Sequence, residues 1–127
     1  QMIQAHLMRK RFGGGMRQVG ILAAAALYAI NNHRERLSDD HRNAKKLAEG
    51  LAQIPGFFIN PSHVDTNTVI IDFAERGLEF EKFTSELQEK GILVTQAGRM
   101  KARMVTHLDV NEEDIDRALE IIRDLYQ

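Results

Sequence analysis

The sequence predicts an α+β fold in which helices come first and are followed by a small antiparallel sheet covered by helices. Two observations predict it. Residues 1–54 carry helical patterns, either alanine-rich or with apolar residues every three or four positions. After Pro55-Gly56, short alternating segments come in pairs, and an amphipathic helical segment follows each pair. Separate runs of helices and antiparallel strand pairs are typical of the α+β class.

Three helices are predicted in the first half. Residues 1–11 form the first, which ends at three consecutive glycines. Residues 16–31 form the second, and because alanine combines high helix propensity with little bulk, we expect this helix to be largely buried. Residues 34–53 form the third helix. Its apolar face is predicted to contain Leu37, His41, Ala44, Leu47, Ala48, Leu51 and Ile54.

Four short strands are predicted in the second half, at residues 57–59, 67–73, 92–95 and 102–107. Alternation along the second of these strands places its odd-numbered residues on one face. A helix at residues 78–90 lies between the strand pairs. Asn111 is the predicted N-cap of the last helix, and Val110 with Ile115 is the predicted hydrophobic staple.

Composition narrows the function classes. The chain has 127 residues, enough for one domain with a core, and its net charge of −1 gives no overall basic surface for nucleic acid. It contains no cysteine, and its five histidines take no metal-binding spacing of the HExxH kind, so we expect no metal site. The longest apolar run, residues 19–30, is too short to cross a bilayer. We expect no nucleic-acid or membrane partner and a cytoplasmic location.

Cations surround the glycine run. Lys10 precedes Gly13-Gly14-Gly15, and Arg17 follows it at the start of the second predicted helix. Glycines, helix amides and fixed cations together can hold a phosphate. The alternative is solvated charge beside a helix break, and the run lacks the GK[ST] ending of a Walker motif. From the residues alone, Lys10 and Arg17 are compatible with either a phosphate site or solvated charge.

Arg103 lies inside an otherwise apolar strand. Alternation places it on one face with Val105 and His107. A guanidinium can hold a carboxylate bidentately, whereas the alternative is an exposed arginine at a sheet edge. His107 and Asp109 could suggest acid–base chemistry, but a histidine at a strand end is more often structural. We also assign structural roles to His33, His41 and Asp65-Thr66-Asn67.

Two long segments resemble the signature of the low-specificity L-threonine aldolases. They are RKRFGGGMRQVGILAAA at residues 9–25 and RMVTHLDV at residues 103–110. Two shorter segments fit the same pattern in the right order, DHRNA at residues 40–44 and DTN at residues 65–67. The resemblance covers essentially the whole chain.

The resemblance implies a pyridoxal 5'-phosphate enzyme of fold type I, typically a homotetramer, that cleaves L-threonine and L-allo-threonine to glycine and acetaldehyde. It implies that Lys10 and Arg17 reach the cofactor phosphate of a neighbouring subunit and that Arg103 holds the substrate carboxylate. Residues 1–32 then correspond to the tail of the large cofactor-binding domain and a connecting helix. Residues 33–127 correspond to the small C-terminal α+β domain.

The Schiff-base lysine of this family lies upstream, in a Ser-Lys-Gly segment that does not occur in this sequence. We therefore expect the chain to be the C-terminal part of an aldolase, without a catalytic residue and inactive by itself. One alternative is another fold type I β-hydroxy amino acid lyase, because preference for the substrate side chain is set upstream. The other is a non-catalytic α+β interaction module that uses apolar surface on the first two helices.

Overall fold

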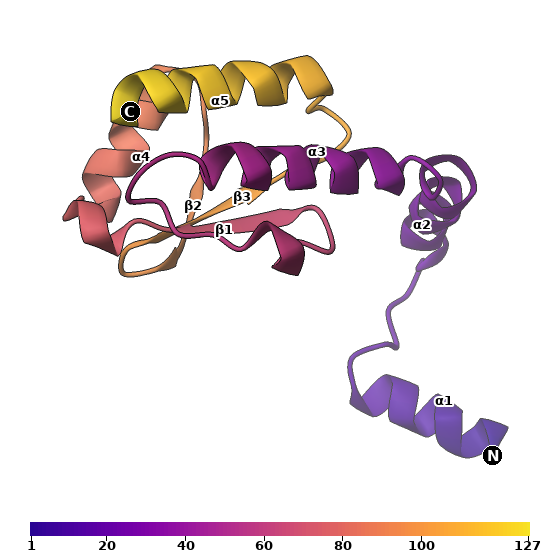
Figure 1. The fold of residues 1–127 in the computed structure, drawn as a ribbon. Coiled ribbons are helices and arrows are strands. Elements are labelled where there is room, and N and C mark those ends of the chain that lie inside the picture. Colours follow the sequence, from indigo (N-terminus) through magenta and orange to yellow (C-terminus); the bar gives the residue numbers. More distant parts are fainter. The chain divides into compact units, whose positions relative to one another are not determined.

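A computed structural model describes residues 1–127, and these divide into two compact units, residues 1–35 and residues 36–127. The first unit contains α1 (Met2–Arg11) and α2 (Gly20–His33). The second contains α3 (Leu37–Leu51), η1 (Pro61–His63), β1 (Thr68–Asp72), η2 (Ala74–Arg76), α4 (Phe80–Glu89), β2 (Thr95–Gly98), β3 (Lys101–Val105) and α5 (Glu112–Tyr126) (Figure 1). The α+β class is confirmed. The assignment of residues 1–32 to a large cofactor domain stays a prediction.

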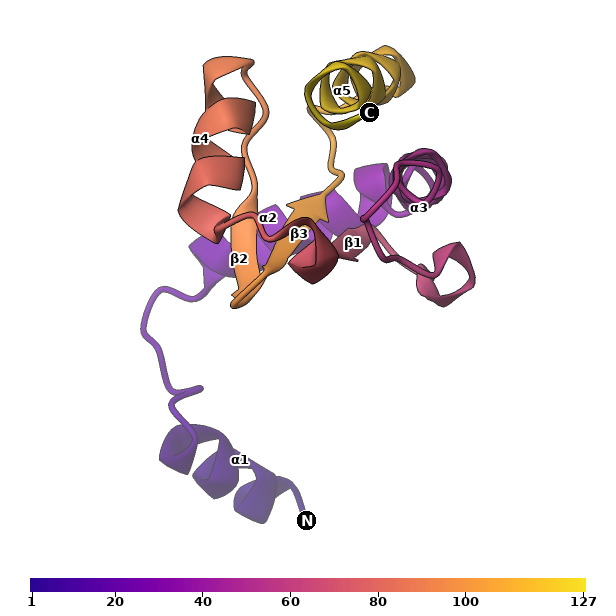
Figure 2. The same cartoon turned by 60° about the vertical axis from the view of Figure 1, so that its left-hand side comes forward.

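The three strands form one antiparallel sheet in the order β1-β3-β2. Helices α3, α4 and α5 all lie on one side of this sheet (Figures 1 and 2). The residues facing that side are buried, as the alternation predicted: Val69, Ile71, Ala102 and Met104. The opposite face is open within this unit, so Ile70 and Val105 remain 48% and 44% exposed there.

Local sequence signals set the start of α5. The Asn111 side chain accepts a hydrogen bond from the Asp114 backbone N–H, and the Asp114 carboxylate accepts one from the Asn111 N–H, both at 3.0 Å. This reciprocal capping box satisfies two amides that the helix itself cannot pair. The predicted N-cap is confirmed, and Ile115 is buried in the core.

Two of the predicted strands differ from the structure. Residues 57–59 contribute a single bridge between Phe58 and Asp72 rather than a strand. The strand predicted at residues 92–95 lies instead at Thr95–Gly98, so the prediction and β2 share only Thr95. Ile92 and Val94 pack against the core without pairing. Ile92 and Val94 are apolar because they pack against the core. The position of β2 is set instead by its pairing with β3.

The prediction that the second helix is largely buried is wrong for this chain. None of the residues of α2 is buried, and Ile21, Leu22 and Tyr28 are more than half exposed. Alanine-rich composition favours the helix itself, but no partner for its apolar surface lies in its own unit. None of the helices has the length and apolar content needed to cross a lipid bilayer.

Candidate functional site

Arg103 lies in the middle of the open sheet face. β3 is the central strand, and Arg103 is paired with Ile70 on β1 and with Thr95 on β2. Its backbone neighbours Ala102 and Met104 point into the core and anchor the strand. The predicted alternation is confirmed, because Arg103 and Val105 both lie on the exposed side.

One hydrogen bond orients the Arg103 guanidinium. Its Nε donates to Thr95 Oγ1 at 3.1 Å, while the terminal nitrogens have no partner in the chain. A guanidinium held at Nε with its outer nitrogens free can donate two parallel hydrogen bonds to a carboxylate. The structure places Arg103 where such a ligand can reach it. Its predicted role in binding the substrate carboxylate stays a prediction.

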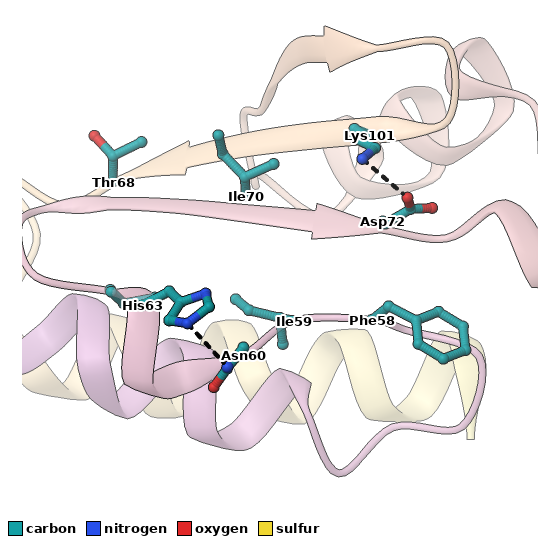
Figure 3. A pocket seen from close by; sticks show the side chains of 9 residues that line it. Phe58, Ile59, Asn60, His63, Thr68, Ile70, Asp72 and Lys101 are labelled. Carbon is teal, nitrogen blue, oxygen red and sulfur yellow. Dashed lines mark hydrogen bonds and ion pairs between the residues drawn. The ribbon is translucent and has the colours of Figure 1, made fainter.

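A pocket of about 280 Å³ opens beside β1, between that strand and the segment that carries Asn60 and His63 (Figure 3). Its charged groups already satisfy one another. Lys101 Nζ lies 3.2 Å from Asp72 Oδ2, and the Ala74 N–H donates to Asp72 Oδ1 at 2.9 Å. The Ala74 N–H first, and then Lys101, lower the pKa of the Asp72 carboxyl. Lys101 is therefore already paired, whereas the terminal nitrogens of Arg103 on the same sheet face have no partner in the chain.

Lys10 and Arg17 lie in the first unit, on either side of the glycine run. Lys10 lies in the last turn of α1, whereas Arg17 lies in the turn before α2, which begins at Gly20 rather than at residue 16. Both side chains are exposed, and neither has a hydrogen-bond or ion-pair partner in the chain. Both cations are therefore available to a ligand, and their predicted role in binding the cofactor phosphate stays a prediction.

The glycine run folds back over the end of α1. The N–H groups of Gly13 and Gly14 donate to the carbonyls of Lys10 and Arg9. A Cβ on Gly14 would lie 2.9 Å from Arg9 Cγ, and one on Gly15 would lie 3.2 Å from Lys10 Cγ. A side chain at Gly14 would therefore force Arg9 to move, whereas one at Gly15 would need only a small shift of Lys10. Since the Gly13 and Gly14 N–H groups are used within the loop, the donors that remain for a phosphate group are the exposed cationic side chains.

Sequence reasoning missed a cluster of buried polar residues, formed by Asp40, Asn43 and Thr106. Arg36 pairs bidentately with Asp40, at 2.7 and 3.1 Å, and this pairing raises the pKa of Arg36. The sequence shows only that two of these residues share a helical face with core positions. Asp40 and Asn43 lie on the same helical face as Ala44 and are buried. The prediction that Leu37 and His41 belong to that face is wrong, because both are exposed.

His107 and Asp109 are both exposed after the end of β3. The Asp109 N–H donates to His107 Nδ1 at 3.3 Å, which closes a local turn. The carboxylate of Asp109 lies 3.7 Å from the same ring nitrogen. These contacts agree with the structural interpretation of His107.

Comparison with known proteins adds a family and several relatives. Residues 2–76 match the family model described as beta-eliminating lyase. The chain is 39% identical over 117 residues to low-specificity L-threonine aldolase 1 of Arabidopsis thaliana, covering 91% of this chain and 33% of that protein. It is 36% identical over 107 residues to the low specificity L-threonine aldolase of Escherichia coli K12, covering 84% of this chain and 30% of that protein. The chain spans about a third of the length of the curated relatives it matches.

Proposed function

The chain belongs to the beta-eliminating lyase family, and from that premise we propose that it is the C-terminal part of a pyridoxal phosphate-dependent threonine aldolase. The proposed reaction is the cleavage of L-threonine and L-allo-threonine to glycine and acetaldehyde. The names of the relatives support it. The observation that carries it is the Arg103 guanidinium, which is oriented by Thr95 and has its outer nitrogens free on the open sheet face.

Arg103 has a positioning role in this proposal. Two charge-assisted hydrogen bonds to the substrate carboxylate fix the orientation of the amino acid about Cα, which brings the scissile bond into a reactive alignment. When bound, pyridoxal phosphate supplies the electron sink for cleavage of the Cα–Cβ bond. Lys10 and Arg17 supply positive charge to its phosphate group. The chain contributes ligands for both negative groups, while the covalent anchor is provided by the rest of the protein.

The first unit supports an assembled enzyme. Residues 1–34 contain no acidic residue, so Lys10 and Arg17 have no carboxylate partner there, and the apolar residues of α2 are exposed. Exposed apolar surface together with unpaired cations is suited to an interface that also carries an anion. We therefore propose that this unit packs against the rest of the cofactor-binding domain and against a neighbouring subunit in a homotetramer. A cytoplasmic role in threonine catabolism and glycine biosynthesis completes the proposal.

The test is a substrate panel on the full-length protein. Acetaldehyde release from L-threonine and L-allo-threonine, dependent on added pyridoxal phosphate, is the expected result. The chain of residues 1–127 serves as the control and is expected to release none. Absence of acetaldehyde from the cofactor-saturated full-length protein would contradict the proposal.

The beta-eliminating lyase family also leaves room for a second candidate, a fold type I lyase acting on other β-hydroxy amino acids. Arg103 binds a carboxylate, which every amino acid carries, so it does not distinguish side chains. Phenylserine and serine in the same panel separate the two. Faster cleavage of phenylserine than of L-threonine would favour this candidate.

A further inference from the structure

We propose that Thr106 is a positioning residue, whose buried hydroxyl holds the end of β3 against α3 and thereby sets the place of the Arg103 guanidinium. The proposal rests on the proposed function of Arg103 as the carboxylate ligand. It concerns a residue that touches neither substrate nor cofactor.

Thr106 is the point at which the chain leaves the sheet. It follows β3 directly and is only 1% exposed. Its Oγ1 donates to the Asp40 carbonyl at 2.7 Å, and its N–H donates to the Asn67 carbonyl at 3.0 Å. The Thr106 carbonyl accepts from Asn67 Nδ2 at 2.8 Å. Every polar group of Thr106 is therefore bonded, and the side chain alone reaches the helix layer.

The acceptor of this hydroxyl is itself held in place. Asp40 is 3% exposed, and its carboxylate takes both hydrogen bonds of the bidentate pair with Arg36. Arg36 is the residue at which the second compact unit begins. A second hydrogen bond also joins α3 to the segment after β3: Asn43 Nδ2 donates to the Val110 carbonyl at 3.2 Å. The segment after β3 is thus fastened to α3 at two points.

This arrangement brings together three segments that are far apart in the sequence. Residues 40–44 lie on α3, residues 65–67 lead into β1, and residues 103–110 include the end of β3. The sequence alone predicted no contact between them. The hydrogen bonds of Thr106 and Asn43 join these segments to one another. All three segments therefore contribute residues to one hydrogen-bonded cluster.

The link to Arg103 follows from the sheet. Backbone pairing with β1 and β2 fixes Arg103 laterally, but the antiparallel pairing of β3 ends at Val105. Beyond it, the backbone of Thr106 is bonded to Asn67, and the Thr106 hydroxyl, which also lies 3.4 Å from the Asn67 carbonyl, adds the hydrogen bond that links the strand end to α3. If this bond is lost, the strand end can shift and carry the guanidinium with it. A misplacement of about 1 Å can weaken a catalytic alignment by about 10²-fold.

The experiment compares Thr106→Val, which removes the hydroxyl at nearly constant volume, with Thr106→Ser, which keeps it. Both are made in the full-length protein. We expect Thr106→Val to raise KM for L-threonine about tenfold, as a partial misalignment should, and Thr106→Ser to restore a KM close to that of the parent. Thr84→Val is the matched control. It removes a half-buried hydroxyl that donates to the Phe80 carbonyl within α4, and it should leave KM unchanged.

A purely structural role predicts another pattern. In that case Thr106→Val lowers Tm and the yield of folded enzyme, but KM of the folded fraction stays at the parent value. That result would overturn the proposal. If Thr106→Val does not fold, Thr106→Ser still tests the proposal, because it keeps the hydroxyl. A Thr106→Ser enzyme with the Tm of the parent but a KM raised about tenfold would also overturn the proposal.

A double-mutant cycle tests whether Thr106 acts through Arg103. In an Arg103→Ala background, Thr106→Val should produce no further change in the dissociation constant for glycine, measured by calorimetry. Additive losses would contradict the proposal. Calorimetry also separates this inference from the proposed reaction. If the full-length protein binds glycine with the expected Thr106 dependence but cleaves no β-hydroxy amino acid, the reaction is wrong and the positioning role stands. If it binds no amino acid at all, both are wrong.

Discussion

The two compact units of this chain differ in almost every physical respect. Residues 36–127 contain the whole buried core, three strands and a slight excess of acidic over basic residues, seventeen against twelve. Residues 1–35 contain no buried residue, and they carry five basic residues against one acidic residue, Glu35. An apolar helix with no buried face and cations with no partner are what the proposed contact with another part of the enzyme requires. The second unit builds its own core, whereas the first supplies surface and charge.

Leucine truncation gives the largest expected effect on this comparison. Leu51 is fully buried in the second unit, and Leu22 on α2 is 56% exposed. Leu51→Ala should lower the free energy of unfolding of the 127-residue chain by about 2–5 kcal/mol, because it removes core contacts and leaves a cavity. Leu22→Ala should change it by less than about 0.5 kcal/mol. Chemical denaturation measures both, and similar losses would show that α2 is packed in this chain.

The carboxylate site gives the next largest effect. Arg103→Ala in the full-length protein should raise KM for L-threonine about 100-fold, since it removes a charge-assisted bidentate contact. Arg103→Lys keeps the positive charge but loses the paired donors that bind a carboxylate bidentately, so we expect an intermediate KM. Steady-state assays of acetaldehyde release measure it. Unchanged KM and kcat in Arg103→Ala would remove the carboxylate assignment.

The first unit is tested through its cations. Lys10→Ala combined with Arg17→Ala should weaken cofactor retention about tenfold or more, because hydrogen bonds between charged groups are lost. Absorbance of bound pyridoxal phosphate after dilution reports retention. Arg34→Ala removes another exposed cation from the same unit and is the control. Equal retention by the parent and the double variant would mean that these cations are only solvated charge.

The smallest effect concerns the edge of the pocket in the second unit. The Ala74 N–H and Lys101 hold the pKa of Asp72 below its ordinary value of about 3.9. A carboxylate with a lowered pKa stabilises the fold above that ordinary value, and the contribution is lost as pH falls through the pKa of the folded state. The Tm difference between the parent and Asp72→Asn should be present at neutral pH and fade below about pH 4. Asp124→Asn, at an exposed site without an ion pair, should show a smaller difference; a pH-independent difference at Asp72 would contradict the assignment.

Features of this fold that depend on residues close together in the sequence could be predicted, whereas features that depend on distant residues could not. The α5 cap and the alternation of β1 and β3 were predictable because each depends on residues adjacent in sequence. The place of β2 was not, since it depends on pairing with β3 rather than on the apolar residues before it. Burial of Asp40 and Asn43 depends on Thr106, Val110 and Arg36. Those partners become visible only when helix and sheet are packed together.

The candidate site divides in the same way. Arg103 could be chosen because a charged residue inside an apolar strand is conspicuous, and alternation gave its face. The glycine run drew notice to Lys10 and Arg17, but the helix start beyond them at Gly20 was not evident from composition. The bond from Arg103 to Thr95 was not predictable, because it required the register of β2 against β3.

Amide hydrogen exchange tests the contrast between the two units most directly. In the chain of residues 1–127, we predict slow exchange along α3, β1 and β3 and fast exchange along α2, because α2 has no packed face to prevent its opening. In the full-length protein, the amides of α2 should become protected while those of the second unit change little. Protection of α2 equal to that of α3 in the isolated chain would contradict the account.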